Sequence, residues 1–161
     1  SESRSESRAE SRAEWRSASS ADFGVFLERS LALLAEEHPR SHRRLCDHMA
    51  GCTVQFEVDG RAVAVRFEPG RAWLSRARDA RATTFARLDR ATLLDLVDAV
   101  VSLPDAILAD RFHLRADLDD VVRFHDALIV YLRGALRCPG FPALLRAYRE
   151  GRPPPRPFAT R

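Results

Sequence analysis

Apolar residues between positions 21 and 38 recur every three or four residues, the spacing of an amphipathic helix. His38-Pro39 ends this helix, because the residue before a proline disfavours helical geometry. The pattern predicts a second short helix over 41–49, closed by Gly51. Charged residues fall largely outside the apolar face of the first helix, which contains Phe23, Phe26, Leu27, Leu31, Leu33 and Leu34.

The hydrophobic period changes to two in the next segment, which predicts a β-hairpin. Apolar residues alternate with polar ones on both sides of Asp59-Gly60, a strong two-residue turn signal. Such a turn pairs Val54 with Val65 and Phe56 with Val63, so these four side chains share one apolar face. We expect helices to cover that face alone. The opposite face receives Gln55, Glu57, Ala62 and Ala64.

The rest of the chain alternates between strand and helix signals. Asp89, Ser102 and Asp117 precede three helical patterns as N-caps. The order predicts an α+β fold, with one five-stranded, mainly antiparallel sheet and the helices on one face. We expect strands over 71–75, 83–88 and 112–115, and helices from Asp89 to Val101, over 102–109, over 118–137 and over 141–148.

The two ends of the chain lack the pattern of a folded segment. Residues 1–16 read SESR-SESR-AESR-AEWR, and on a helix this repeat would stack like charges four residues apart. Residues 151–161 are rich in Pro and Arg. We therefore expect a disordered segment over 1–20, a folded domain over 21–150 and a flexible tail over 151–161.

Charge and cysteine content limit the binding partners and the cell compartment that we expect for this protein. All 26 basic residues are Arg, and the excess positive charge lies in 151–161, so the neutral folded part gives no sign of a nucleic-acid partner. The longest apolar run, 127–132, is too short to cross a bilayer. Three cysteines without an export signal indicate a reduced, cytoplasmic protein. The absence of Lys beside abundant Arg and Ala is typical of a GC-rich, bacterial genome.

One group of residues has the spacing of metal ligands. His38, His42 and Cys46 are four residues apart, and His48 and Cys52 are close by. The proline after His38 interrupts the helix that would align them, and no CxxC pair is present. We therefore expect surface histidines, a buried thiol and no bound metal.

Two other groups have a plain structural alternative to a functional role. His113 and His125 lie among several aspartates, but an acidic first helical turn accounts for those without acid–base chemistry, so we predict no catalytic residue and no cofactor. Arg76, Arg78 and Arg81 share one loop. They would suit an anionic head group in a transient membrane contact, or they form an ordinary solvated loop.

Four features follow one another over residues 21–148: the opening helix, the hairpin VQFEVDG-RAVAVRF, the Trp73 strand and the segment ATTFARLDRATLLDLVDAVVSLPDAILADRFHLRADLDDVVRFHDAL. In this order they resemble the sterol carrier protein type 2 family. Two glycines of the family pattern are replaced, one by Asp110-Arg111 and one by Ala116. The matching positions are Asp89, Leu93-Leu94, Pro104-Asp105, Leu114 and Asp117.

The resemblance implies an apolar tunnel between sheet and helices that holds a lipid, such as a sterol, fatty acid, acyl-CoA or phospholipid. The predicted function is therefore non-catalytic binding or carriage of a hydrophobic molecule. An enzyme or accessory protein acting on a hydrophobic metabolite, and a protein-interaction module with an apolar groove, are the alternatives. The predicted tunnel wall consists of Phe56, Val65, Phe85, Val97, Val101, Leu128, Leu132, Leu136, Phe141 and Leu144.

Overall fold

The computed structural model describes residues 22–151, which contain six helices and five strands. The predicted segment 1–20 and all of the predicted tail 151–161 except Gly151 lie outside the described residues. No helix within 22–151 is long and apolar enough to span a membrane. In chain order the elements are α2 (Phe23–Glu37), α3 (Pro39–Met49), β1 (Thr53–Val58), β2 (Arg61–Glu68), β3 (Arg71–Ser75), β4 (Thr84–Leu88), α4 (Arg90–Val97), α5 (Leu103–Leu108), β5 (Phe112–Arg115), α6 (Leu118–Ala135) and α7 (Phe141–Glu150).

The five strands form one mixed sheet in the order β3-β2-β1-β4-β5. Val54 pairs with Val65 and Phe56 with Val63, so the register expected from the Asp59-Gly60 turn is confirmed. The central pair, β1 and β4, is parallel, and the other three pairs are antiparallel. The predicted α+β fold with a mainly antiparallel sheet is therefore correct.

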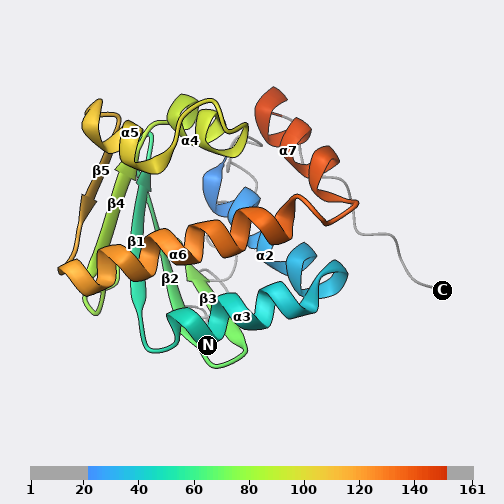
Figure 1. The fold of residues 1–161 in the computed structure, drawn as a ribbon, viewed down its shortest axis with the longest axis horizontal. Coiled ribbons are helices and arrows are strands. Elements are labelled where there is room, and N and C mark those ends of the chain that lie inside the picture. The colour runs from blue at the N-terminus through green and yellow to red at the C-terminus, as the bar shows by residue number, and fades with distance from the viewer. Residues whose placement is uncertain (1–21, 152–161) are drawn as a thin grey trace, which may run out of the picture.

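Helices α2, α3, α6 and α7 lie on one side of the sheet, and α4 and α5 run along one end of the strands (Figure 1). The Asp22 carboxylate accepts from the Gly24 N–H (2.8 Å) and caps α2, and Asp89 caps α4 in the same way through Thr92. Ser102 caps α5. Asp117 occupies the N-cap position of α6, but its side chain makes no capping hydrogen bond.

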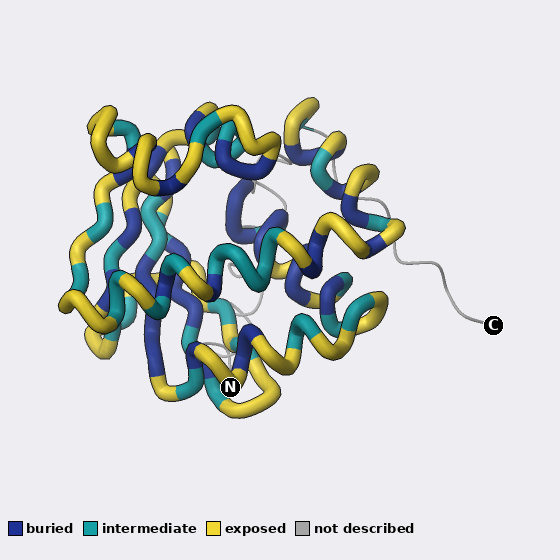
Figure 2. The backbone as a smooth tube through the Cα atoms, in the orientation of Figure 1, coloured by how far each residue is buried: buried dark blue, intermediate teal, exposed yellow. Residues whose placement is uncertain are grey.

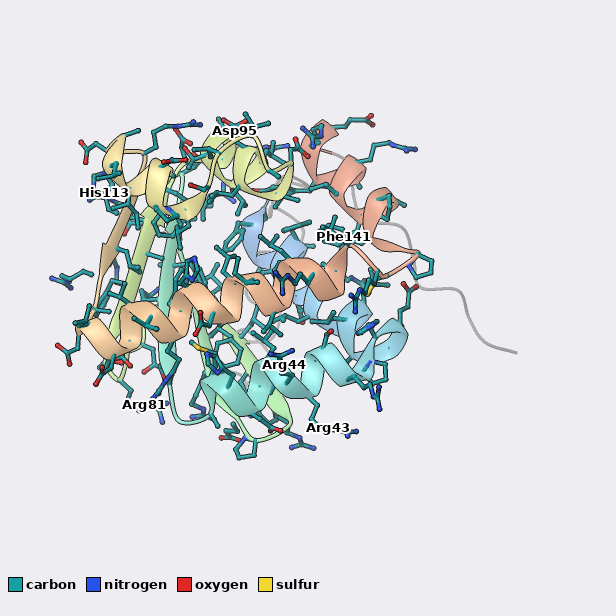
Figure 3. The ribbon with its side chains drawn as sticks, viewed as in Figure 1. Arg43, Arg44, Arg81, Asp95, His113 and Phe141 are labelled. Carbon is teal, nitrogen blue, oxygen red and sulfur yellow. The ribbon has the colours of Figure 1, made fainter. Side chains whose placement is uncertain are left out.

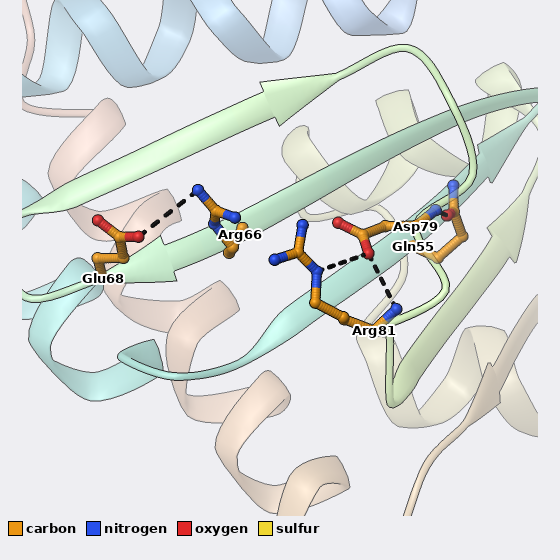
Figure 4. Close-up of polar contacts among 5 residues, drawn as sticks. All are labelled: Gln55, Arg66, Glu68, Asp79 and Arg81. Atoms are coloured by element: carbon orange, nitrogen blue, oxygen red, sulfur yellow. Dashed lines mark hydrogen bonds and ion pairs between the residues drawn. The ribbon is translucent and has the colours of Figure 1, made fainter.

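The outer face of the sheet is partly covered, which corrects the expectation of an open polar face. The 76–83 connection runs from the edge strand β3 to β4 and crosses β2 and β1 on that face. The Asp79 N–H donates to Gln55 Oε1 (2.9 Å), and Arg81 bonds back to the Asp79 carboxylate, as Figure 4 shows. Gln55 is consequently buried, because the loop replaces water above it.

The buried residues lie between the sheet and the helices (dark blue in Figure 2). Helix α4 ends at Val97, four residues before the predicted end, where the chain turns through the left-handed residue Ala99 (φ 56°). Val100 is consequently exposed rather than packed in the core. The three cysteines are free and buried.

Candidate functional site

An apolar cavity of about 100 Å³ lies between the inner face of the sheet and helices α2, α3, α4 and α6. None of the side chains that line it is charged, and tyrosine is the only residue among them with a polar side-chain group. The lining residues are Phe23, Phe26, Leu27, Leu31, Leu45, Met49, Val54, Phe56, Val65, Phe67, Leu88, Leu93, Leu96, Val97, Phe112, Phe124, Ala127, Leu128, Tyr131 and Leu132.

Strand alternation and helix periodicity together produce this lining. The inward positions of β1 and β2 carry large apolar side chains, and the paired β4 position opposite Phe56 is the small Ala86. Aromatic rings close one end, since Phe56 and Phe112 both lie 6.1 Å from Phe124, centroid to centroid. Contacts at this spacing add to the apolar burial of each ring.

The hydroxyl group of Tyr131 already has a protein partner. It donates to Ser30 Oγ (2.7 Å), and the Ser30 hydroxyl donates in turn to the Leu27 carbonyl (2.8 Å). Burial raises the pKa of Tyr131 to about 12, so this phenol is neutral at ordinary pH. The cavity can therefore offer apolar contact to a ligand, but no charge.

Half of the predicted wall lines the cavity. Phe141 and Leu144 are buried in the core at the start of α7, and Val101 is half-buried after α4. Figure 3 shows Phe141 where α6 leads into α7. None of these three borders the cavity. The predicted residues that do are Phe56, Val65, Val97, Leu128 and Leu132.

Phe85 and Leu136 are corrections to the predicted wall. Phe85 pairs with Gln55 on the outer face, because its neighbours Thr84 and Ala86 take the inward positions of β4. Leu136 is 68% exposed. Steps of four residues rotate about 40° around a helix, so two steps from Leu128 carry the stripe away from the cavity.

Sequence reasoning missed the part of the wall that α2 and α3 contribute. The apolar face of the first helix was visible as a core face, and its residues Phe23, Phe26, Leu27 and Leu31 border the cavity. From α3, Leu45 and Met49 do the same. The sequence signal was the helical period itself, which marks an inward face without separating packed core from cavity wall.

No three His, Cys, Asp or Glu side chains converge as a metal site within residues 22–151. His42 Nε2 lies 3.7 Å from Cys46 Sγ, and His48 instead contacts the Arg123 carbonyl (3.2 Å). Burial lowers the pKa of His42, and burial with the nearby Asp47 charge raises the pKa of the Cys46 thiol to about 11. Both groups are therefore neutral near pH 7.

The two histidines considered for acid–base chemistry lie outside the cavity. His113 is on the outer face of β5, 3.5 Å from the Asp110 carboxylate. His125 on α6 lies 3.4 Å from Asp126. Figure 3 shows His113 at the opposite end of the molecule from Phe141.

Each arginine of the 76–83 loop is paired with a carboxylate. Arg76 pairs with the buried Asp22, Arg78 with Glu57 (3.0 Å) and Arg81 with Asp79 (3.3 Å). The hydrogen bond from the Arg81 backbone N–H lowers the pKa of Asp79. These pairs fasten the loop to the sheet.

Comparison with known proteins rests on the fold alone. No protein-family model and no curated protein matches the sequence. The sterol carrier protein domain 2 of Helicoverpa armigera aligns at 14% identity and a TM-score of 0.54, over 70% of this chain and 91% of that one. A ubiquinone synthesis protein, UbiJ-SCP2, aligns at 14% identity and 0.52, over 66% and 95%.

The sec-alkylsulfatase Pisa1 from Pseudomonas sp. shares 18% identity at a TM-score of 0.44, and the match spans 51% of this chain but only 14% of the enzyme. The sterol carrier protein and UbiJ-SCP2 matches have TM-scores above 0.5 and cover most of the compared domains. The chain therefore has a sterol carrier protein 2-like fold.

Proposed function

We propose that this protein binds a hydrophobic small molecule, a lipid, fatty acyl or sterol-like compound, between its sheet and helices, and carries it without chemical change. The observation that supports this is the uncharged cavity, placed between sheet and helices in a sterol carrier protein 2-like fold. The free, buried cysteines and the bacterial composition favour a bacterial cytoplasm as the setting.

Burial of apolar area would supply the binding energy, at about 25 cal/mol per Å². At about 100 Å³, the cavity holds only a small apolar group as it stands, since pockets for drug-sized ligands measure about 300–1,000 Å³. A longer chain would have to displace wall side chains. The half-buried Leu93, Leu128 and Leu132 border the cavity and are the least confined of its leucines.

The names of two fold relatives agree with a hydrophobic ligand. One is a sterol carrier protein and the other a ubiquinone synthesis protein, and both sterols and ubiquinone are hydrophobic. At 14% identity neither indicates which compound this chain would take.

Titration with a fluorescent fatty acid tests the proposal, with Leu132→Trp as the blocking variant. Because Leu132 borders the cavity, the indole should fill it and weaken binding at least about tenfold, or about 1.4 kcal/mol. Leu136→Trp is the matched control, since that position is exposed one turn further along. Its affinity should equal that of the parent.

Native mass spectrometry of the purified protein provides an independent readout. A co-purified lipid that is absent from Leu132→Trp would support carriage. Failure of the parent to bind fatty acid, together with a loss of about 1–3 kcal/mol of stability in Leu132→Trp, would indicate a packed core and overturn the proposal. A stable dimer or a stoichiometric protein partner without lipid would favour the interaction-module hypothesis instead.

A further inference from the structure

A second hollow, larger than the cavity, lies on the outer face of the sheet over β1, β4 and β5. Its volume is about 540 Å³, within the range of about 300–1,000 Å³ typical of small-molecule pockets. The turn after α5 and the 76–83 loop each contribute lining residues. The lining consists of Gln55, Glu57, Arg78, Phe85, Ala86, Arg87, Ile107, Asp110, Phe112, His113, Leu114 and Arg115.

The strand register places the outward side chains of this hollow in two rows. Gln55, Phe85 and Arg115 are paired across β1, β4 and β5 in one row. Glu57, Arg87 and His113 form the next row. The same strands turn their alternate residues into the apolar cavity, so the two sites share a sheet but lie on opposite faces of it.

The carboxylates of the hollow already have cationic or histidine partners. Arg78 donates to Glu57 (3.0 Å), and His113 Nδ1 lies 3.5 Å from Asp110. Arg87 stands between these two pairs. Within residues 22–151, its guanidinium group makes no hydrogen bond or ion pair with another side chain.

Arg115 is likewise free of carboxylate partners within the described part of the chain, and its guanidinium carbon lies 4.4 Å from the centroid of the Phe85 ring. An arginine held over an aromatic ring keeps its N–H donors available to a carboxylate. Two guanidinium groups without carboxylate partners therefore line the hollow.

The hollow also offers apolar contact. Phe85 is only half-buried, although it is a phenylalanine on a strand next to the centre of the sheet. Ile107, at 38% exposure, is a second solvent-accessible apolar side chain in the lining. Arginine donors beside accessible apolar surface suit a ligand with a flat apolar body and one anionic group.

We propose that this outer hollow is a binding site for a small aromatic carboxylate, separate from the apolar cavity. The carboxylate is held by Arg87 and Arg115, and the ring contacts Phe85 and Ile107. This site does not depend on the proposed lipid-binding function, because its two arginines lie on the face of the sheet opposite the inner cavity.

Binding of 2-naphthoate to the full chain tests the proposal, followed by fluorescence or NMR titration. Arg87→Gln should weaken binding roughly tenfold, because one charge-assisted hydrogen-bond donor is lost. Arg43→Gln is the matched control: Arg43 lies exposed on α3, away from the sheet (Figure 3). It removes the same charge and should leave the affinity unchanged.

Two further measurements show in which of the two sites the naphthoate binds. Leu132→Trp blocks the inner cavity and should leave naphthoate binding intact, while 2-naphthalenemethanol, which lacks the charge, should bind the parent and Arg87→Gln equally weakly. Thermal melting of every variant verifies folding. Loss of naphthoate binding in Leu132→Trp but not in Arg87→Gln would place the ligand in the cavity and overturn the proposal. Equal losses in Arg87→Gln and Arg43→Gln, or no saturable binding at millimolar concentration, would also overturn it.

Discussion

The guanidinium group of Arg90 lies over the ring of Tyr148, 4.6 Å from its centroid, and joins α4 to α7. The same group donates to the Tyr148 carbonyl and to the Arg149 carbonyl (2.8 Å) at the end of α7. A cation at this place satisfies carbonyls that have no partner within the helix. The Tyr148 ring in turn stacks on Phe26 of α2, 4.5 Å between centroids.

Arg90→Met should therefore lower the free energy of unfolding by about 2 kcal/mol, through the lost cation–π contact and two charge-assisted hydrogen bonds. Urea unfolding at neutral pH measures this. Arg149→Gln is the comparison, because Arg149 binds Asp98 in an exposed ion pair (2.8 Å) between the same two helices. That change should cost less than about 1 kcal/mol. Equal costs for the two variants would contradict the role given to Arg90.

A close approach of two helices accounts for a second prediction. A Cβ at Gly134 of α6 would lie 2.6 Å from the Ser41 Cβ of α3 and 2.7 Å from Leu34 Cδ1. Gly134→Ala should thus destabilise the protein by about 1–3 kcal/mol, although alanine is the better helix former by about 1 kcal/mol. Thermal or urea unfolding measures the loss. Adding Ser41→Gly should recover part of it, and a stabilised Gly134→Ala protein would show that the helices can separate at no cost.

The local signals in the sequence were sufficient for the order of helices and strands and for the register of the hairpin. The change of period at β1 and the Asp59-Gly60 turn set the register of the hairpin, and the caps at Asp89 and Ser102 marked where α4 and α5 begin. These features depend on residues a few positions apart. A one-residue slip would turn every apolar side chain of the hairpin outward, so the pattern is a strong constraint.

The candidate site was harder to predict because it depends on which side chains of β4 point toward the helices. Phe85 is the aromatic residue of that strand and was assigned to the tunnel wall, yet the strand pairing turns Ala86 inward. Sequence alone also could not foresee that the 76–83 loop crosses the outer face and buries Gln55. Both facts depend on strand order, which no local pattern encodes.

The buried phenol of Tyr131 predicts a loss of stability at alkaline pH. Its pKa is raised to about 12, whereas an unfolded tyrosine ionises near about 10. Between these values the unfolded state loses its proton first, so stability falls as pH rises, by about 2–3 kcal/mol over the whole interval. Tyr131→Phe should flatten this decline in urea unfolding measured from about pH 9 to 11.

Tyr148, whose pKa burial also raises to about 12, remains as an internal reference for that experiment. Tyr148→Phe should produce a flattening of similar size, and the two effects should add. A decline that is as steep in Tyr131→Phe as in the parent would show that the Tyr131 hydroxyl meets water in the folded state.

The cavity wall on α6 predicts how a bound fatty acid should change the thermal stability of the protein. Leu128→Ala removes a half-buried side chain that borders the cavity, so it should cost the ligand-free protein about 2 kcal/mol or more and leave additional space. A saturated fatty acid should enter that space, so saturating ligand should raise the melting temperature of Leu128→Ala more than that of the parent.

Leu136→Ala, exposed on the same helix, should lose little stability and respond to the fatty acid as the parent does. Differential scanning calorimetry with and without dodecanoate measures all three proteins. A melting temperature of Leu128→Ala that dodecanoate leaves unchanged would mean that the enlarged space is closed to acyl chains.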